Sequence, residues 1–283
     1  VDDALATVVF GLRRLLAGFG SGQGRARGWS SVRRAVDDLD QRLLRPLSDQ
    51  LGGRDLVVCP NVSLTAVPWP LLPLAQHRRL RVAPSATVWC RSRRNGPATS
   101  DALVAVAGPG LAGAEDEIRD IATLRKGCVT LVGPEATVAR VLAESERVST
   151  LHLAAHGRLR TDNPLFSTVE LADGPLTGYD LESLQRVPST VLLSACSSGA
   201  GHATVAEETL GLAWTLMGAG ATTVVAPLLP VPDAATRALM VDVHRRLADG
   251  APPSTALACA QADADPDDPL SVGVASVFVA YGA

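Results

Sequence analysis

Apolar residues recur every three to four positions through the first fifty residues of the chain. The first stripe comprises Leu5, Val8, Val9, Leu12, Leu15 and Leu16, and the second comprises Val32, Val36, Leu39, Leu43, Leu44 and Leu47. This spacing places each set on one face of an α-helix. Glycines between residues 18 and 22 separate the stripes. The sequence therefore predicts two amphipathic helices ahead of the rest of the chain.

From about residue 55 the pattern changes to short apolar runs that alternate with helical segments. The runs that predict strands are 56–59, 80–83, 103–107, 128–132, 150–157, 190–199, 221–226 and 274–280. The segments that predict helices are 115–124, 136–146, 207–218, 234–247 and 254–262. Short apolar runs closed by glycine are typical of strands buried in a parallel sheet. We therefore expect an α/β fold with helices on both faces of a mostly parallel sheet.

The composition narrows the class of protein. A net charge of −3 gives no electrostatic reason to expect nucleic acid or an anionic membrane as a partner. No apolar run is long enough to span a bilayer. Lys126 is the only lysine beside many arginines, which we interpret as the coding bias of a GC-rich bacterial genome. The chain begins without Met or a signal-peptide pattern, so we expect a piece of a longer protein.

The cysteines predict neither a zinc site nor a disulfide framework. Five are present, an odd number, and none lies in a CxxC pair. A reducing cytoplasm is the compartment we expect. Four of them lie in apolar contexts and are expected to be small core residues: Cys59, Cys90, Cys128 and Cys259.

Two of the predicted strands end beside residues that can carry nucleophilic catalysis. His156 follows one apolar run and Cys196 follows another, 40 residues later. Ligands bind beyond the carboxyl ends of parallel strands, so both side chains are expected at the same edge of the sheet. A neighbouring His can raise the thiolate character of a Cys, and the thiolate is the nucleophile. This pair indicates a cysteine-dependent reaction.

Other motifs favour plainer interpretations. The GPGLAG segment at 108–113 fits GxGxxG, but acidic residues follow where a pyrophosphate would lie, so a strand-to-helix turn is favoured. His152 and His156 have HExxH-like spacing but lie on a strand-like run, so His152 is expected to be packed or supporting and no metal is expected. The aspartates at 263–268 lack the Gly and Glu of a calcium loop and predict a solvated turn. His244 is expected at the surface or a helix cap.

Several segments in the same order resemble the CHAT domain, a caspase-like family related to caspases and separase and often found after tetratricopeptide repeats. The matching segments are LHLAAHG at 151–157, NPLFS at 163–167, LSAC at 193–196, EETLGLA at 207–213, GAGA at 218–221, VVA at 224–226 and VPDAAT at 231–236, with VPW at 67–69 and PSA at 84–86 in the earlier half. Ser197 and Ser198 stand where Glu-Thr is common, and Leu229 stands where Trp is frequent. Neither departure touches the His and Cys.

The resemblance implies a cysteine endopeptidase that needs no cofactor. Cys196 would be the nucleophile and His156 the general acid/base, with the backbone N–H groups of Gly157 and Cys196 forming the oxyanion hole. Asp233 would favour Arg or Lys as the substrate residue just before the cleaved bond. Its alternative role is to cap the helix that follows. Glu208 and Ser194 are assigned to the same substrate-binding region, with surface or helix-start charge as the alternative for Glu208.

The resemblance also implies an architecture and a context. Residues 1–52 would be a helical lead-in that could form the end of an upstream repeat or sensor region. Residues 53–283 would be the peptidase domain at the C-terminal end of a bacterial protein. Its expected partners are a protein substrate and a regulatory upstream domain or activator, in antiviral defence or cell death. The competing interpretation is a catalytically silent caspase-like scaffold that binds a protein in the same cleft.

Overall fold

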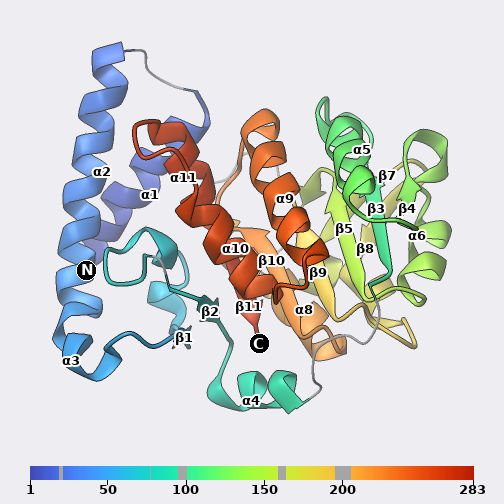
Figure 1. Ribbon diagram of the computed structural model, residues 1–283, viewed down its shortest axis with the longest axis horizontal. Helices are drawn as coiled ribbons and strands as arrows, with labels where there is room; N and C mark the ends of the chain where they lie inside the picture. Colours follow the sequence, from blue (N-terminus) through green and yellow to red (C-terminus); the bar gives the residue numbers. More distant parts are fainter. Residues whose placement is uncertain (19–21, 77, 95–100, 159–163, 195–204) are drawn as a thin grey trace.

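A twisted eight-stranded sheet forms the centre of the computed structural model, which describes all residues except 19–21, 77, 95–100, 159–163 and 195–204 (Figure 1). The strand order is β1-β2-β11-β10-β9-β5-β3-β4. The strands are β1 Leu56–Val58, β2 Leu80–Val82, β3 Leu103–Ala107, β4 Val129–Leu131, β5 Thr150–Ala154, β9 Thr190–Leu193, β10 Thr223–Pro227 and β11 Phe278–Gly282. A second sheet contains β6 Gly157–Arg158, β7 Thr168–Leu171 and β8 Gly174–Thr177.

The large sheet consists of two parallel blocks that meet at one antiparallel pair. Strands β10, β9, β5, β3 and β4 are parallel to one another, and β1, β2 and β11 are parallel to one another. Only the β10–β11 junction is antiparallel. The carboxyl ends of β3, β5, β9 and β10 therefore lie at one edge of the sheet. This confirms the expected mostly parallel α/β architecture and brings the loops after these four strands together.

Helices cover both faces of this sheet (Figure 1). The helices are α1 Asp2–Leu16, α2 Gly22–Leu43, α3 Ser48–Leu51, α4 Ala86–Arg94, α5 Ala114–Leu124, α6 Val138–Ser145, α7 Gly178–Glu182, α8 Val205–Ala219, α9 Asp233–Ala248, α10 Pro253–Ala262 and α11 Pro269–Val277. Helices α5, α9, α10 and α11 lie on one face of the sheet. Helix α9 packs against α5, α10 and α11, and α10 also packs against α11. Helices α6 and α8 lie on the opposite face, as right-handed crossovers between parallel strands require.

The alternation of side chains along β5 explains how the two faces differ. Ala154 joins Ala105 and Ala107 of β3 in a cluster with Ile118 of α5. These small side chains let α5 approach the sheet closely. Leu151 and Leu153, which point to the other face, belong to the larger core. The sequence of β5 thus places its even-numbered residues, including His152, under α5.

The two N-terminal helices pack into the main core. Buried leucines of α1 and buried valines of α2 belong to the same apolar cluster as the sheet. Gly273 of α11 lies so close to α1 that an added Cβ would be 2.9 Å from Leu15 Cδ2. The division between residues 52 and 53 stays a prediction, and the packing adds that the lead-in helices share their interior with the sheet.

The strand predicted at 274–280 is wrong in detail. Residues 274–277 belong to helix α11, and the last strand runs only from Phe278 to Gly282. Asp268 caps α11 by accepting from the backbone N–H groups of Leu270 and Ser271. The assignment failed because the run from 274 to 280 is apolar throughout, and such runs do not distinguish helix from strand.

The cysteines expected in the core also differ from the structure. Cys59 and Cys90 are exposed, and Cys128 and Cys259 are only partly buried. All four are free thiols. Within the described ranges, every helix is too short or too polar to cross a membrane.

Candidate active site

Just beyond the end of β5, the backbone of His156 is held by strand β7 and its ring by the loop between β3 and α5. Its carbonyl oxygen accepts from the Glu170 N–H of β7 at 2.8 Å. Its ring Nε2 lies 3.2 Å from the carbonyl oxygen of Gly110, in the loop between β3 and α5. Because a carbonyl can only accept, Nε2 carries the proton in this contact. In the neutral ring, Nδ1 then holds the free lone pair.

The β3–α5 loop reaches His156 because two of its residues are glycines. Gly110 adopts a φ of +77°, a conformation that side chains disfavour, and its carbonyl is turned toward the histidine ring. At Gly108 an added Cβ would lie 2.3 Å from Ala155 Cβ and 2.6 Å from the Glu170 carbonyl oxygen. The GPGLAG segment is therefore a strand-to-helix turn, as expected, whose glycines permit close approach.

Asp233, the first residue of α9, is half-buried on the other side of this loop. An added Cβ at Gly113 would lie 3.3 Å from Asp233 Cβ. Pro232 occupies the N-cap position, and among the described residues no side chain caps this helix. The capping role considered as an alternative is therefore not found. Burial raises the pKa of Asp233, His156 opposes that shift by attraction, and Glu117 adds to it by repulsion.

Gly157 follows His156 directly and begins β6. The peptide between them is trans, so its N–H points opposite to its C=O. Since the His156 carbonyl points to β7, the Gly157 N–H points away from β7. Among the described residues, an added Cβ at Gly157 would meet Thr168 O alone, at an ordinary contact distance of 3.5 Å. Packing against this part of the chain does not by itself require glycine there.

The structure does not place every predicted site residue. Cys196 lies outside the described residues, and so does the side chain of Glu208 on α8. Ser194 is buried just after β9, and its hydroxyl lies 3.5 Å from the Leu153 carbonyl oxygen that its own N–H also contacts. Its role in substrate binding stays a prediction. The described geometry thus brings together His156, Gly157 and Asp233.

A cavity of about 790 Å³ opens beside the same loop. It is lined by residues 107–112, by the first turns of α5 and by Gly133, Pro134 and Ala172. It shares Gly110 with the His156 contact. Its described lining does not include His156, so the cavity lies beside the loop that holds the histidine ring.

Comparisons with known proteins identify the family and the fold. The family model described as "CHAT domain" matches residues 33–271, most of the chain. The chain belongs to the CHAT domain family. The match begins inside α2, so it takes in part of the expected lead-in. A search of curated proteins gave no match.

Solved structures show that this CHAT domain has a fold of the cysteine-peptidase type. Separase from Saccharomyces cerevisiae, in complex with securin, is 12% identical with a TM-score of 0.60 over 81% of this chain and 16% of its own length. Porphyromonas gingivalis RgpB, solved as a complex of pro- and mature domains, is 12% identical with a TM-score of 0.56, covering 99% of this chain and 75% of that one. A structure of the Arg-specific cysteine proteinase gingipain R (RGPB) is 10% identical, with a TM-score of 0.53, covering 99% of this chain and 74% of that one. This CHAT domain thus spans only a small part of the separase chain.

The sequence analysis missed a buried polar cluster beneath the CHAT domain site. His244, expected at the surface, is fully buried, and it contacts His152. Glu117, interpreted as one of several charges at a helix start, is buried and contacts the other nitrogen of His152. The only available signal was the position of Glu117 on the inner face of a predicted amphipathic helix. Within the described part of the chain, no cluster of side chains is arranged to hold a metal.

Cys128 is expected to be a poor nucleophile at neutral pH. Burial raises its pKa to about 11, although Arg125 acts in the opposite direction. Its alkylation by iodoacetamide should therefore accelerate about tenfold per pH unit from pH 7 to pH 10. Peptide mass spectrometry can follow this rate, with exposed Cys90 as the internal comparison. A rate for Cys128 that levels off below pH 9 would contradict the assignment.

Proposed function

We propose that this CHAT domain is a cysteine endopeptidase that uses Cys196 and His156. The observation that carries the proposal is the fixed position of His156 at the carboxyl edge of the sheet, beside the end of β9. β5 and β9 are direct parallel neighbours, with Leu153 opposite Leu193. His156 follows β5 by two residues and Cys196 follows β9 by three. Neighbouring strands that end in a base and a nucleophile are suited to acyl transfer.

The orientation of the histidine supports a separate role for each ring nitrogen. Nε2–H donates to the Gly110 carbonyl, which fixes the ring plane and leaves Nδ1 for proton transfer. In the proposed reaction the Cys196 thiolate attacks the scissile carbonyl, and protonated His156 Nδ1 gives its proton to the leaving amine. Water, deprotonated by the same nitrogen, then attacks the acyl group and displaces the sulfur, which restores the thiolate and the protonated ring.

Gly157 is proposed to stabilise the tetrahedral intermediate. Its N–H points away from β7, and no contact with the described residues explains the lack of a side chain. A bound carbonyl that needs this space would explain it. Together with the Cys196 N–H it would supply the two donors that developing negative charge requires.

Asp233 is proposed to select Arg or Lys before the cleaved bond. Its half-buried carboxylate is close enough to His156 to interact with it electrostatically and has no capping role. A carboxylate in such a place favours a guanidinium through charge-assisted hydrogen bonds. The solved relative with the same fold that is described as Arg-specific supports this choice. Glu208 and Ser194 are proposed to line the same region.

The domain is further proposed to act under the control of an upstream segment or an activator protein, in a bacterial defence or cell-death response. Two relatives were solved as complexes, separase with securin and the RgpB pro-domain with its mature domain. These support protein partners in general. A reducing cytoplasm would keep Cys196 in its thiol form and is the compartment we propose.

The test is digestion of a peptide library by this protein, with and without cell extract as a source of activator. We expect cleavage after Arg or Lys. In parallel, an arginyl acyloxymethyl ketone should label Cys196 and leave Cys128 unlabelled, because the pKa of the Cys128 thiol is about 11. Labelling without cleavage would indicate a competent site that awaits its substrate. If the protein is neither labelled nor able to cleave any peptide, the result would favour the binding scaffold.

A further inference from the structure

A buried chain of hydrogen bonds connects three elements beneath the site. Glu117 lies on α5, His152 on β5 and His244 on α9. His152 Nε2 is 2.8 Å from Glu117 Oε1, and His152 Nδ1 is 3.1 Å from His244 Nε2. Both histidines are 0% exposed and Glu117 is 4% exposed. A direct contact at each end leaves no room for an ion between the three groups.

The contacts assign a proton to each bond. An ionised carboxylate only accepts, so His152 Nε2 donates to Glu117. In a neutral ring His152 Nδ1 must then accept, which makes His244 Nε2 the donor to it. His244 Nδ1 keeps a lone pair that meets no partner among the described residues. Burial, His152 and Arg125 all lower the pKa of His244 well below its ordinary value, in keeping with a neutral ring.

The three elements are those that carry the site. His152 precedes His156 by four residues on β5 and its extension. Glu117 is in the first turn of α5, directly after the loop whose Gly110 carbonyl holds His156. His244 lies eleven residues along α9 from Asp233. Each end of the buried chain is thus tied to an element that supplies one group near His156: the Gly110 carbonyl contacts the ring, and Asp233 interacts with it electrostatically.

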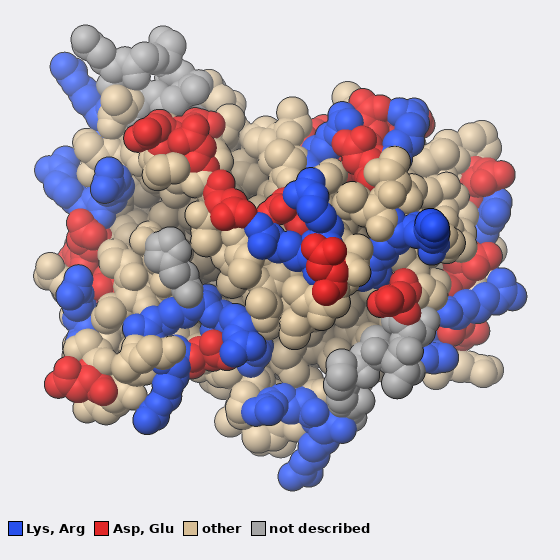
Figure 2. Space-filling model, viewed as in Figure 1, with Lys and Arg blue, Asp and Glu red and all other residues tan. Residues whose placement is uncertain are grey.

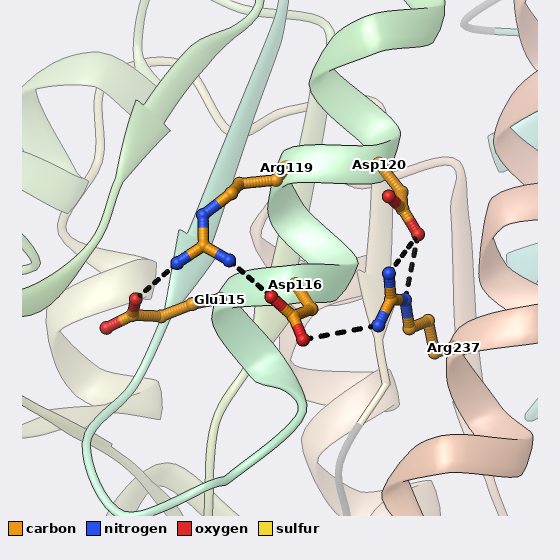
Figure 3. Close-up of polar contacts among 5 residues, drawn as sticks. All are labelled: Glu115, Asp116, Arg119, Asp120 and Arg237. Atoms are coloured by element: carbon orange, nitrogen blue, oxygen red, sulfur yellow. Dashed lines mark hydrogen bonds and ion pairs between the residues drawn. The ribbon is translucent and has the colours of Figure 1, made fainter.

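A second, exposed set of ion pairs joins the same two helices (Figure 3). Arg237 of α9 contacts Asp120 at 2.7 Å and Asp116 at 3.3 Å, and Arg119 links Asp116 to Glu115. Positive and negative side chains are correspondingly interspersed over α5 and α9 on this face (Figure 2). Exposed pairs contribute little and are screened by salt. The buried chain is therefore the better candidate for setting the geometry.

We propose that Glu117, His152 and His244 position α5 and α9 against β5, and so hold the Gly110 carbonyl and Asp233 in place around His156. The inference rests on the proposed function of His156. An apolar trio would pack this interior at least as stably, because buried charged and polar groups rarely add net stability. Hydrogen bonds add direction, and an error of about 1 Å in placing a reacting group can cost about 10²-fold in rate.

The first test compares two substitutions of one residue. His244→Gln keeps a side-chain N–H that can donate to His152 Nδ1, whereas His244→Leu leaves that nitrogen unpaired. We expect kcat on an arginyl peptide to fall at least about tenfold in His244→Leu and by less than about threefold in His244→Gln. Val243→Ala is the matched control, since it removes buried volume from the neighbouring position of α9. It should lower the melting temperature while kcat stays within about twofold.

The second test needs no catalytic activity. Nitrogen-15 NMR of the histidine rings at pH 7 should show the Nε2–H tautomer for both His152 and His244. The His156 ring signals should shift in His244→Leu and stay in place in His244→Gln. If the wild-type protein cleaves nothing, these spectra still decide the positioning role, while the peptidase proposal fails separately. If His244→Leu does not fold, the wild-type tautomers and the His244→Gln spectrum decide it.

Three outcomes would overturn the proposal. The first is an Nδ1–H tautomer at His152. The second is a folded His244→Leu protein with wild-type kcat and unmoved His156 signals. The third is a loss of kcat in Val243→Ala as large as in His244→Leu, because the role of His244 would then be one of general stability.

Discussion

Replacing Cys196 with Ala should lower the rate of peptide cleavage at least about 10³-fold, because the reaction then lacks its nucleophile. The substitution removes one sulfur atom and adds no volume, so the fold should persist. Initial rates on an arginyl peptide measure the effect, and circular dichroism verifies the fold. Cys128→Ala is the matched control and should retain wild-type rates, because that thiol, with a pKa of about 11, is hardly ionised at neutral pH.

His156→Gln tests whether His156 and Cys196 serve one chemical step. The glutamine amide can still donate to the Gly110 carbonyl but cannot transfer a proton, so kcat should fall by about 10²- to 10⁴-fold. Groups that act as a unit are strongly non-additive. The double variant Cys196→Ala, His156→Gln should therefore be no slower than Cys196→Ala alone. If the rate losses of the two single variants multiplied in the double variant, Cys196 and His156 would act in separate steps. The proposed dyad would then be wrong.

Asp233→Asn should remove most of the preference for basic residues. Loss of a charge-assisted hydrogen bond is expected to lower kcat/KM for an arginyl peptide by about 10- to 100-fold. Peptides with an uncharged residue at that position should change by less than about threefold. Asp242→Asn is the control, because Asp242 lies on the same helix but pairs at the surface with Arg245 and Arg246. Equal losses for both kinds of peptide would exclude Asp233 as the selecting residue.

The same carboxylate should give the preference a dependence on pH. Burial, reinforced by repulsion from Glu117, raises the pKa of Asp233 above its ordinary value of 3.8. Only the ionised form attracts a guanidinium, so the preference is complete above the raised pKa and is lost as the pH falls through it. The ratio of kcat/KM for arginyl and neutral peptides should decline at a higher pH than an ordinary aspartate would give. In Glu117→Gln the decline should move to lower pH, and an unmoved profile would contradict the assignment.

The sequence predicted the sheet well because its signals are local. The runs at 103–107 and 150–157 are short, apolar and bounded by breakers, which is sufficient to predict buried strands, although β5 itself ends at Ala154. The position of His156 follows from the same signals, since the run that contains it ends at the carboxyl edge of the sheet. The segment at 108–113 is a turn before a helix, as the acidic residues that follow it indicated.

The contacts around His152 could not be predicted, because they join residues that are distant in sequence. Glu117 and His244 lie 35 and 92 residues from His152. A charged residue in the first turn of a helix is ordinarily exposed and favourable there, which is how Glu117 was interpreted. The burial of Glu117 and His244 depends on the register of α5 and α9 over β5. That register is set by small residues such as Ala105 and Ala154, whose importance emerges only from packing.

The place of β11 in the sheet has a consequence for how the chain folds. Tyr281 pairs with Val82 on one side and with Val224 on the other, so the last strand joins the edge strands β1 and β2 to the five strands that carry the site. Pairing β2 with β11 closes the loop that contains all residues between them, and closing so long a loop is entropically costly and slows folding. During synthesis, β2 cannot pair with β11 until the chain has been made as far as Gly282. A chain cut shortly before Phe278 would leave two half-sheets with exposed strand edges, the kind of intermediate that aggregates.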